Sequence, residues 1–182
     1  MNISLEMKKK FDIYTQLLLF WNKTHNLGGN LNHQIIQAYL LDSVFPLDFI
    51  KPFKKCMDIG SGAGFPAIAL AICREQSQFL LVEPRQKRYA FLQYVCMELG
   101  LVNVEVYKKR VEEMDKCIIV DLVTSRALMA TQNLIALSQD FLSDEGYYLF
   151  YKGGNLHQEI TEDISKYIQK DQRIYFYERK KV

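Results

Sequence analysis

The segment from Asp58 to Pro66 reads D-I-G-S-G-A-G-F-P and carries the clearest chemical signal in this chain. Its glycines stand at alternate positions, which predicts a sharp turn between a strand and a helix. A backbone without Cβ atoms bends tightly there and lets a ligand approach closely. The helix expected after the turn directs its free N–H groups toward the same place. The pattern is typical of a loop that binds a nucleotide cofactor.

A carboxylate, Glu83, follows nineteen residues after Gly64, at the end of the next expected strand. Open parallel sheets bind ligands beyond the carboxyl ends of their strands, so the loop and Glu83 are expected at one edge. A carboxylate in this place accepts hydrogen bonds from both hydroxyls of a ribose. The pair predicts an adenosine-containing cofactor, with a plain tight turn and a solvated strand end as the alternative.

The elements that must position these residues alternate between strands and helices. Strands are expected at 55–59, 78–83, 103–107, 120–125 and 146–152. Helices are expected at 65–75, 86–99, 131–142 and 156–168. This alternation predicts an α/β fold of the Rossmann-like kind, a mostly parallel sheet with helices on both faces. The strand-like run at 173–178 is expected to add an antiparallel strand.

Two amphipathic helices are expected before the first strand, at 4–24 with Ser4 as N-cap and at 33–45. They predict an N-terminal helical extension over residues 1–50. A cofactor-binding α/β core would follow over 51–182. With 182 residues the chain is long enough to bury a core, so we expect a single domain over 1–182.

The bulk composition, 49% hydrophobic and 24% charged, is that of an ordinary soluble protein. There is no apolar run of the ~20 residues that span a membrane, and no signal-peptide pattern. We therefore expect a cytoplasmic protein without a membrane partner. Four scattered cysteines indicate reduced thiols. Three separated histidines offer no metal-site spacing, so no metal is expected.

The distribution of charge is more informative than the net charge of +2. Residues 85–110 carry six basic and two acidic groups, whereas residues 111–150 carry two basic and seven acidic groups. Such asymmetry is compatible with one positive face that binds nucleic acid. A solvated helix face is the commoner origin of such a run.

The spacing within the glycine loop discriminates between cofactors. A dinucleotide loop reads G-x-G-x-x-G/A, whereas here Gly64 comes one residue early and Phe65 and Pro66 follow. The loop resembles the G-x-G-x-G loop of class I S-adenosylmethionine-dependent methyltransferases. That resemblance implies the Rossmann-like fold of those enzymes and S-adenosylmethionine as the cofactor.

Further motifs occur in an order that resembles one bacterial family. They are W-N-K-T-H-N-L at 21–27, the glycine loop at 58–66, K-R-x-x-F-L at 87–92, R-V-E-E at 110–113, S-R-A at 125–127 and K-G at 152–153. This series resembles the RsmG (GidB) family, which methylates N7 of a guanosine in 16S ribosomal RNA. The resemblance covers about residues 11–153, with a weaker match at Arg173. It implies a methyltransferase whose partner is 16S ribosomal RNA or the small ribosomal subunit, and we expect a monomer.

The resemblance also implies roles for individual residues. The residues expected to contact the cofactor are Asp58, Gly60, Gly62, Gly64, Phe65, Glu83, Val111, Glu112 and Arg126. The residues expected to contact RNA are Lys87, Arg88, Arg110, Lys152 and Arg173. Among the first set, Glu83 would hold the ribose, while Val111 and Glu112 would flank the adenine.

Arg126 is the one residue expected to act in catalysis, by orienting the guanine or a phosphate where cofactor and RNA meet. Guanine N7 carries a lone pair and no proton, so positioning and electrostatics can supply much of the rate without a general base. The alternative for Arg126 is a structural salt bridge, with Asp121 or Glu112 as partner.

The chain departs from the family pattern at three places. The ribose carboxylate is usually Asp and here is Glu83, and the first motif ends N-L-G rather than N-L-T. The tail after Lys152 is short, so the family's sixth and seventh strands are expected to be compressed or partly missing. Three other functions remain open: a small-molecule methyltransferase, a nicotinamide oxidoreductase, and a non-catalytic RNA-binding module that retains the loop.

Overall fold

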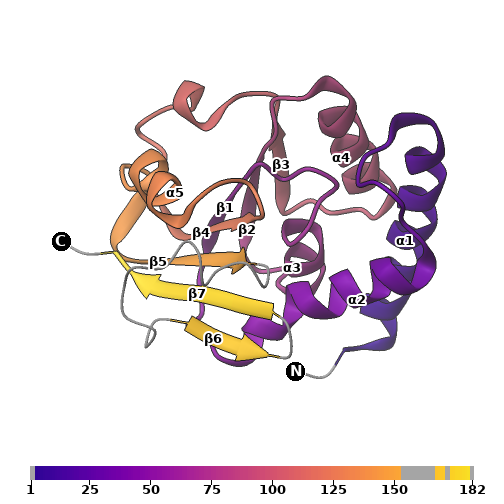
Figure 1. Ribbon diagram of the computed structural model, residues 1–182, viewed down its shortest axis with the longest axis horizontal. Coiled ribbons are helices and arrows are strands. Elements are labelled where there is room, and N and C mark those ends of the chain that lie inside the picture. The colour runs from indigo at the N-terminus through magenta and orange to yellow at the C-terminus, as the bar shows by residue number, and fades with distance from the viewer. Residues whose placement is uncertain (1–2, 153–166, 171–172, 181–182) are drawn as a thin grey trace.

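The computed structural model describes residues 3–152, 167–170 and 173–180 (Figure 1). Within these residues a seven-stranded sheet has the order β3-β2-β1-β4-β5-β7-β6. The strands are β1 (Lys55–Ile59), β2 (Gln78–Val82), β3 (Val104–Tyr107), β4 (Val120–Arg126), β5 (Leu142–Lys152), β6 (Tyr167–Lys170) and β7 (Arg173–Arg179). The first five strands pair in parallel, and β7 pairs antiparallel with both β5 and β6. The mostly parallel α/β sheet is confirmed.

Helices connect the parallel strands and precede them. The α-helices are α1 (Leu5–His25), α2 (His33–Val44), α3 (Ala67–Cys73), α4 (Gln86–Glu98) and α5 (Thr131–Ser138), with 3-10 helices η1 (Phe45–Asp48) and η2 (Val111–Glu113). The Ser4 hydroxyl accepts the Met7 N–H at 3.2 Å and caps α1, as expected. The Asn32 side chain caps α2 in the same way.

Alternate residues of the strands divide the core between the two faces of the sheet. Cys56 and Phe79 pack with α1, α2, α3 and α4 in one hydrophobic cluster. Met57 and Leu80 pack on the other face, with η2 and α5. Figure 1 shows α5 apart from the other four helices. Helices therefore cover both faces, as the alternating pattern predicts.

The two N-terminal helices also support the glycine loop at the end of β1. Tyr14 of α1 is fully buried, and its hydroxyl donates to the Ala63 carbonyl at 2.6 Å. The ring of Phe65 meets the rings of Tyr14 and Tyr39 edge-on, at centroid distances of 5.5 and 5.4 Å. The N-terminal extension thus packs in the same core and holds the glycine loop through Tyr14 and Tyr39.

The structure corrects the sequence prediction between α5 and β5. The helix expected at 131–142 ends at Ser138, and β5 begins at Leu142 rather than at 146. Leu142 pairs with Val120, but Tyr147 already pairs with Leu122, so β5 contains an irregularity. The acidic residues in this stretch resemble a loop in sequence, which conceals a strand whose pairing is interrupted.

The C-terminal strands also differ from the expectation. Both β6 and β7 are present, so neither of the last two strands is missing, although β6 has only four residues. The helix expected at 156–168 is wrong at Tyr167 and Ile168, which begin β6. The rest of that range lies outside the described residues. The antiparallel strand expected at 173–178 is confirmed as β7.

Candidate functional site

The glycine loop has the backbone shape that its sequence requires. Gly60, Gly62 and Gly64 have φ values of +71°, +59° and +101°, a region that L side chains rarely adopt. The Gly60 N–H donates to the Val82 carbonyl at 2.9 Å, which ties the loop to the end of β2. A Cβ added at Gly60 would lie 2.9 Å from both methyl carbons of Leu128. The positive φ therefore requires glycine at this position, and a Cβ would in addition displace the exposed Leu128 side chain.

Glu83 follows β2 and joins the loop through its carboxylate. The side chain is buried, and Oε2 accepts the Gly62 N–H at 2.9 Å while Oε1 accepts the Arg85 N–H at 2.8 Å. A carboxylate offers about four acceptor positions, so two backbone bonds leave capacity for the two hydroxyls of a ribose. The sequence placed Glu83 beside the loop, and the structure brings the two into direct contact.

Asp58 lies in the protein interior, beneath the glycine loop. It is 1% exposed, its Oδ1 accepts the Thr124 hydroxyl at 2.7 Å, and its Oδ2 has no hydrogen-bond partner in the described chain. Burial raises the pKa of this carboxyl to about 7, against the lowering effect of the Thr124 and Ser61 hydroxyls. Asp58 lines none of the three pockets described next, so its place is behind the loop.

Three pockets meet at Gly60, beyond the carboxyl ends of β1, β2 and β4. The polar pocket, about 590 Å³, is lined by Glu83, Pro84, Arg85, Arg88, Lys108, Lys109, Arg110, Glu113 and Leu128 as well as Gly60. The apolar pocket, about 210 Å³, contains Ile59, Val82, Val111, Glu112, Leu128, Met129 and Leu137 in its wall. The arginine pocket, about 340 Å³, contains Tyr39, Phe65, Arg88, Arg126, Leu128 and Arg173 in its wall.

This arrangement fits an adenosine group with a charged extension. An apolar slot at Val111 stands beside the acceptor carboxylate of Glu83, as a purine and its ribose require. Val111 is buried in the slot, whereas Glu112 is exposed at its rim. Gly60 lines all three pockets, so a ligand that extends from one into another passes over the glycine loop.

Arg126 ends β4 in the arginine pocket. Its Nη2 lies 2.8 Å from Oδ2 of Asp42 on α2, and its guanidinium carbon lies 4.5 Å over the Tyr39 ring. Burial lowers the pKa of Arg126, while the Asp42 charge raises it. The salt bridge considered as an alternative does exist, but its partner is Asp42. The expected partner Asp121 instead accepts the backbone N–H groups of Lys54 and Lys55.

The five expected RNA contacts lie in different environments. Arg88 and Arg110 line the polar pocket, and Arg173 lines the arginine pocket. Lys87 is exposed in the first turn of α4 and lines none of the three pockets. Lys152 is 7% exposed, and its ammonium group donates to the Met129 carbonyl at 2.9 Å. The structure thus gathers three of the five basic residues around the loop.

Sequence reasoning missed Tyr39, Asp42 and Leu128. Asp42 is the one acidic residue of α2, a helix that carries no other charged side chain apart from His33, and that isolation is a signal that the sequence does offer. Leu128 follows Ala127, whose φ of +50° is rare for a residue with a Cβ and is typical of strain near functional sites. Nothing in the spacing of Tyr39 relates it to the loop.

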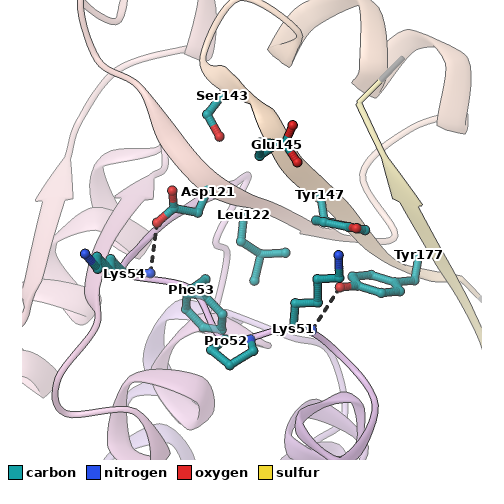
Figure 2. A pocket seen from close by; sticks show the side chains of 10 residues that line it. All are labelled: Lys51, Pro52, Phe53, Lys54, Asp121, Leu122, Ser143, Glu145, Tyr147 and Tyr177. Atoms are coloured by element: carbon teal, nitrogen blue, oxygen red, sulfur yellow. Dashed lines mark hydrogen bonds between the residues drawn. The ribbon is translucent and has the colours of Figure 1, made fainter. Parts of the chain in front are cut away.

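Another pocket, about 400 Å³, lies at the opposite edge of the sheet (Figure 2). It is formed near the amino ends of β1 and β4, and the rings of Tyr147 and Tyr177 stack in its wall at 4.9 Å. The Lys51 N–H donates to the Tyr177 hydroxyl at 2.9 Å. Parallel sheets bind ligands at the other edge, so this pocket is not the candidate site.

The described residues contain neither a candidate membrane span nor a candidate metal cluster. No described helix is both long and apolar enough to cross a membrane. Among the same residues, no group of three or more His, Cys, Asp or Glu side chains is arranged to hold a metal ion.

The sequence matches one family over nearly its whole length. The family described as rRNA small subunit methyltransferase G matches residues 7–181. A protein of Helicobacter bizzozeronii named ribosomal RNA small subunit methyltransferase G is 48% identical over 176 residues, which cover 96% of this chain and 98% of that protein. A protein of the same name from Aliarcobacter butzleri is 38% identical over 181 residues, and the match covers 96% of this chain and 93% of that protein.

Solved structures of methyltransferases share the fold at low sequence identity. A methyltransferase from Geobacter sulfurreducens aligns with a TM-score of 0.64 at 11% identity, over 92% of this chain and 88% of its own. Coclaurine N-methyltransferase, solved with N-methylheliamine and SAH bound, aligns with a TM-score of 0.58 at 16% identity, over 80% of this chain and 49% of its own. These similarities show the class I methyltransferase fold.

Proposed function

The chain belongs to the small-subunit ribosomal RNA methyltransferase G family, and we propose that it transfers a methyl group from S-adenosylmethionine to N7 of a guanosine in 16S ribosomal RNA. The relatives that carry this name match almost end to end. One structural observation carries the proposal: the glycine loop, Glu83 and Arg126 stand around three pockets that meet at Gly60.

The cofactor would lie across the glycine loop. Glu83 would accept the ribose hydroxyls, and the apolar pocket beside Val111 would hold the adenine, with Glu112 at its rim. Gly60, Gly62 and Phe65 would line the path of the methionine part into the arginine pocket. Gly64 lines none of the three pockets and would shape the loop from the core side, where a Cβ would meet Ile68 at 2.7 Å. Asp58, behind the loop, would support it without direct contact. When bound, S-adenosylmethionine supplies a methyl group on a positively charged sulfur.

The residues of the arginine pocket are suited to orientation rather than to proton transfer. Guanine N7 has no proton to lose, so the site needs to hold the base in line and to exclude water. Arg126 is a buried cation whose Nη2 forms an ion pair with Asp42 and whose Nη1 has no hydrogen-bond partner in the described chain. It would bind a phosphate or the O6 edge of the guanine, leaving N7 free to react.

The RNA would approach over the basic rim of the polar pocket. Arg88, Arg110 and Arg173 would contact phosphates near the site, and Lys87 would extend the contact along α4. Lys152 is buried, and its ammonium group donates to the carbonyl of Met129, a residue in the wall of the apolar pocket. Lys152 would therefore act through that wall. Contacts of this kind predict binding that weakens steeply with salt.

The remaining expectations follow from this assignment. We propose one methyltransferase domain over 1–182 that acts as a monomer, without a metal, on the small subunit or its RNA in the cytoplasm. A small-molecule methyltransferase and a non-catalytic RNA-binding module are not favoured, because the relatives named as ribosomal RNA methyltransferases match over nearly the whole chain. A nicotinamide oxidoreductase is excluded by the family match.

The test is transfer of labelled methyl from S-adenosylmethionine to small subunits and to naked 16S ribosomal RNA, both from cells that lack the modification. We expect incorporation into at least one substrate, at a guanosine that becomes sensitive to cleavage chemistry specific for 7-methylguanosine. Absence of transfer to both substrates would overturn the proposal. Transfer at another base position would retain the enzyme class and reject the N7 assignment.

A further inference from the structure

Asp42 stands at the centre of a cluster that joins three elements distant in sequence. Its Oδ2 lies 2.8 Å from Nη2 of Arg126 at the end of β4 and 3.4 Å from Nε of Arg173 at the start of β7. Its Oδ1 accepts the Tyr175 hydroxyl at 2.7 Å. A single carboxylate of α2 therefore fixes one side chain from β4 and two from β7.

The electrostatics of the cluster favour a carboxylate between the two arginines. Two guanidinium groups share one carboxylate, and they repel each other: the Arg173 charge acts to lower the pKa of Arg126. The side chain of Asp42 is 9% exposed and that of Arg126 12%, so water screens these two charges poorly, whereas Arg173 is 37% exposed and is screened more. Without the Asp42 charge, repulsion between the two guanidinium groups would favour conformations in which Arg126 points away from Arg173 and out of the pocket.

Three side chains surround the guanidinium of Arg126. Its guanidinium carbon lies 4.5 Å from the centre of the Tyr39 ring and 5.9 Å from that of the Phe65 ring, while Oδ2 of Asp42 lies 2.8 Å from Nη2. Nη1 has no hydrogen-bond partner in the described chain, and the side chain lines the pocket that contains Gly60. A salt bridge that served only folding would not require the arginine to line this pocket.

We propose that Asp42 is a positioning residue of the methyl-transfer site, which fixes Arg126 and Arg173 so that their remaining donors meet an oxygen acceptor of the substrate nucleotide. This inference rests on the proposed function. The cluster carries a net charge of +1, which suits an anionic or electron-rich acceptor such as a phosphate oxygen or guanine O6. Asp42 acts through the arginines and does not itself touch the substrate.

The experiment is a single-turnover methyl transfer to unmodified small subunits at saturating cofactor, with full-length protein. Asp42→Asn keeps the shape of the side chain and removes its charge. We expect the transfer rate to fall about 10- to 100-fold, as misplaced catalytic groups do, while the dissociation constant for S-adenosylmethionine changes less than about twofold. Asp121→Asn is the matched control: it neutralises a carboxylate at the far edge of the sheet and should retain the wild-type rate.

A double-mutant cycle separates positioning from folding. If Asp42 acts through Arg126, Asp42→Asn slows the Arg126→Lys variant little further, so the two losses are not multiplicative. Fully multiplicative losses, or a wild-type rate in Asp42→Asn, overturn the proposal. Where Asp42→Asn melts too low to assay, Asp42→Glu keeps the charge, moves the carboxylate by one methylene and is expected to slow transfer as well; a wild-type rate in it also overturns the proposal.

The outcome for the wild-type protein distinguishes the two proposals. A wild type that methylates neither the particle nor naked RNA overturns the proposed function, and the positioning role falls with it. An active wild type with an equally active Asp42→Asn overturns the positioning role alone.

Discussion

At the scale of single residues, Arg126 is the side chain on which turnover is expected to depend most. Arg126→Ala removes the guanidinium donors of this residue from the arginine pocket, and Asp42 keeps Arg173 as its partner, so the fold should persist. We expect a loss of about 100-fold or more in methyl transfer, as for deletion of a donor that stabilises developing charge. Circular dichroism and melting temperature provide the folding control. Wild-type turnover in this variant would remove Arg126 from the mechanism.

Gly60 offers a second test with a matched control elsewhere in the chain. Gly60 and Gly29 both have φ of +71°, but a Cβ meets Leu128 at 2.9 Å at Gly60 and nothing within 4 Å at Gly29. Each alanine variant carries a backbone cost of about 1–2 kcal/mol. We expect only Gly60→Ala to lose S-adenosylmethionine affinity in calorimetric titration. Equal affinity in both variants would mean that the cofactor does not cross the loop at Gly60.

The raised pKa of Asp58 predicts how the free energy of unfolding depends on pH. Its folded pKa of about 7 lies above the unfolded value of 3.8, so its contribution to stability is fully present below pH 3.8 and is lost as pH rises through about 7. Asp58→Asn cannot ionise and escapes this loss. Urea unfolding of both proteins between pH 5 and pH 9 should show the free energy of the variant rising relative to wild type. A constant difference would contradict the raised pKa.

At the scale of elements, α1 is expected to tune cofactor binding through one hydroxyl. Tyr14→Phe removes the hydrogen bond to the Ala63 carbonyl and leaves that acceptor without its donor, a cost of about 1–3 kcal/mol. The glycine loop then loses its support, and we expect S-adenosylmethionine to bind about 5- to 10-fold more weakly, since part of that cost appears in binding.

Ser77→Ala serves as the control for this variant. It also deletes a buried hydroxyl that donates to a loop carbonyl, that of Phe53 at 2.7 Å, but at the amino edge of the sheet. A similar loss of stability with unchanged cofactor affinity is expected. If Ser77→Ala weakens binding as much as Tyr14→Phe, the effect of α1 is general and not specific to the loop.

Periodicity predicted those elements whose burial follows a regular pattern. The strands around Met57 and Leu80 and the amphipathic helix with Tyr14 were predictable because their apolar spacing reflects the faces that they bury. The irregular pairing near Leu142 was not, since acidic residues there resemble a turn. Asp42 was not predictable as a partner of Arg126, because a contact between elements that are distant in sequence leaves no spacing to read.

At the scale of the whole molecule, the shared core predicts a single unfolding event. Residues of α1, such as Tyr14 and Leu18, occupy the same hydrophobic cluster as Phe79 of β2 and Tyr175 of β7. We expect one cooperative thermal transition, with equal calorimetric and van't Hoff enthalpies. Near-UV and far-UV circular dichroism should coincide. Two separate transitions would mean that the N-terminal extension and the α/β core are distinct domains.

The link between α2 and β7 has a consequence for how the protein is made. Asp42 and Tyr175 are 133 residues apart, and at synthesis rates of about 5–20 residues per second, roughly 7 to 27 seconds separate their translation. Between the synthesis of Arg126 and that of β7, the nascent chain already contains the residues of the glycine loop, but Arg126 has neither Arg173 nor Tyr175 beside it. A chain that has not yet reached β7 therefore lacks the finished arginine pocket, and competence to modify RNA requires that β7 has been synthesised.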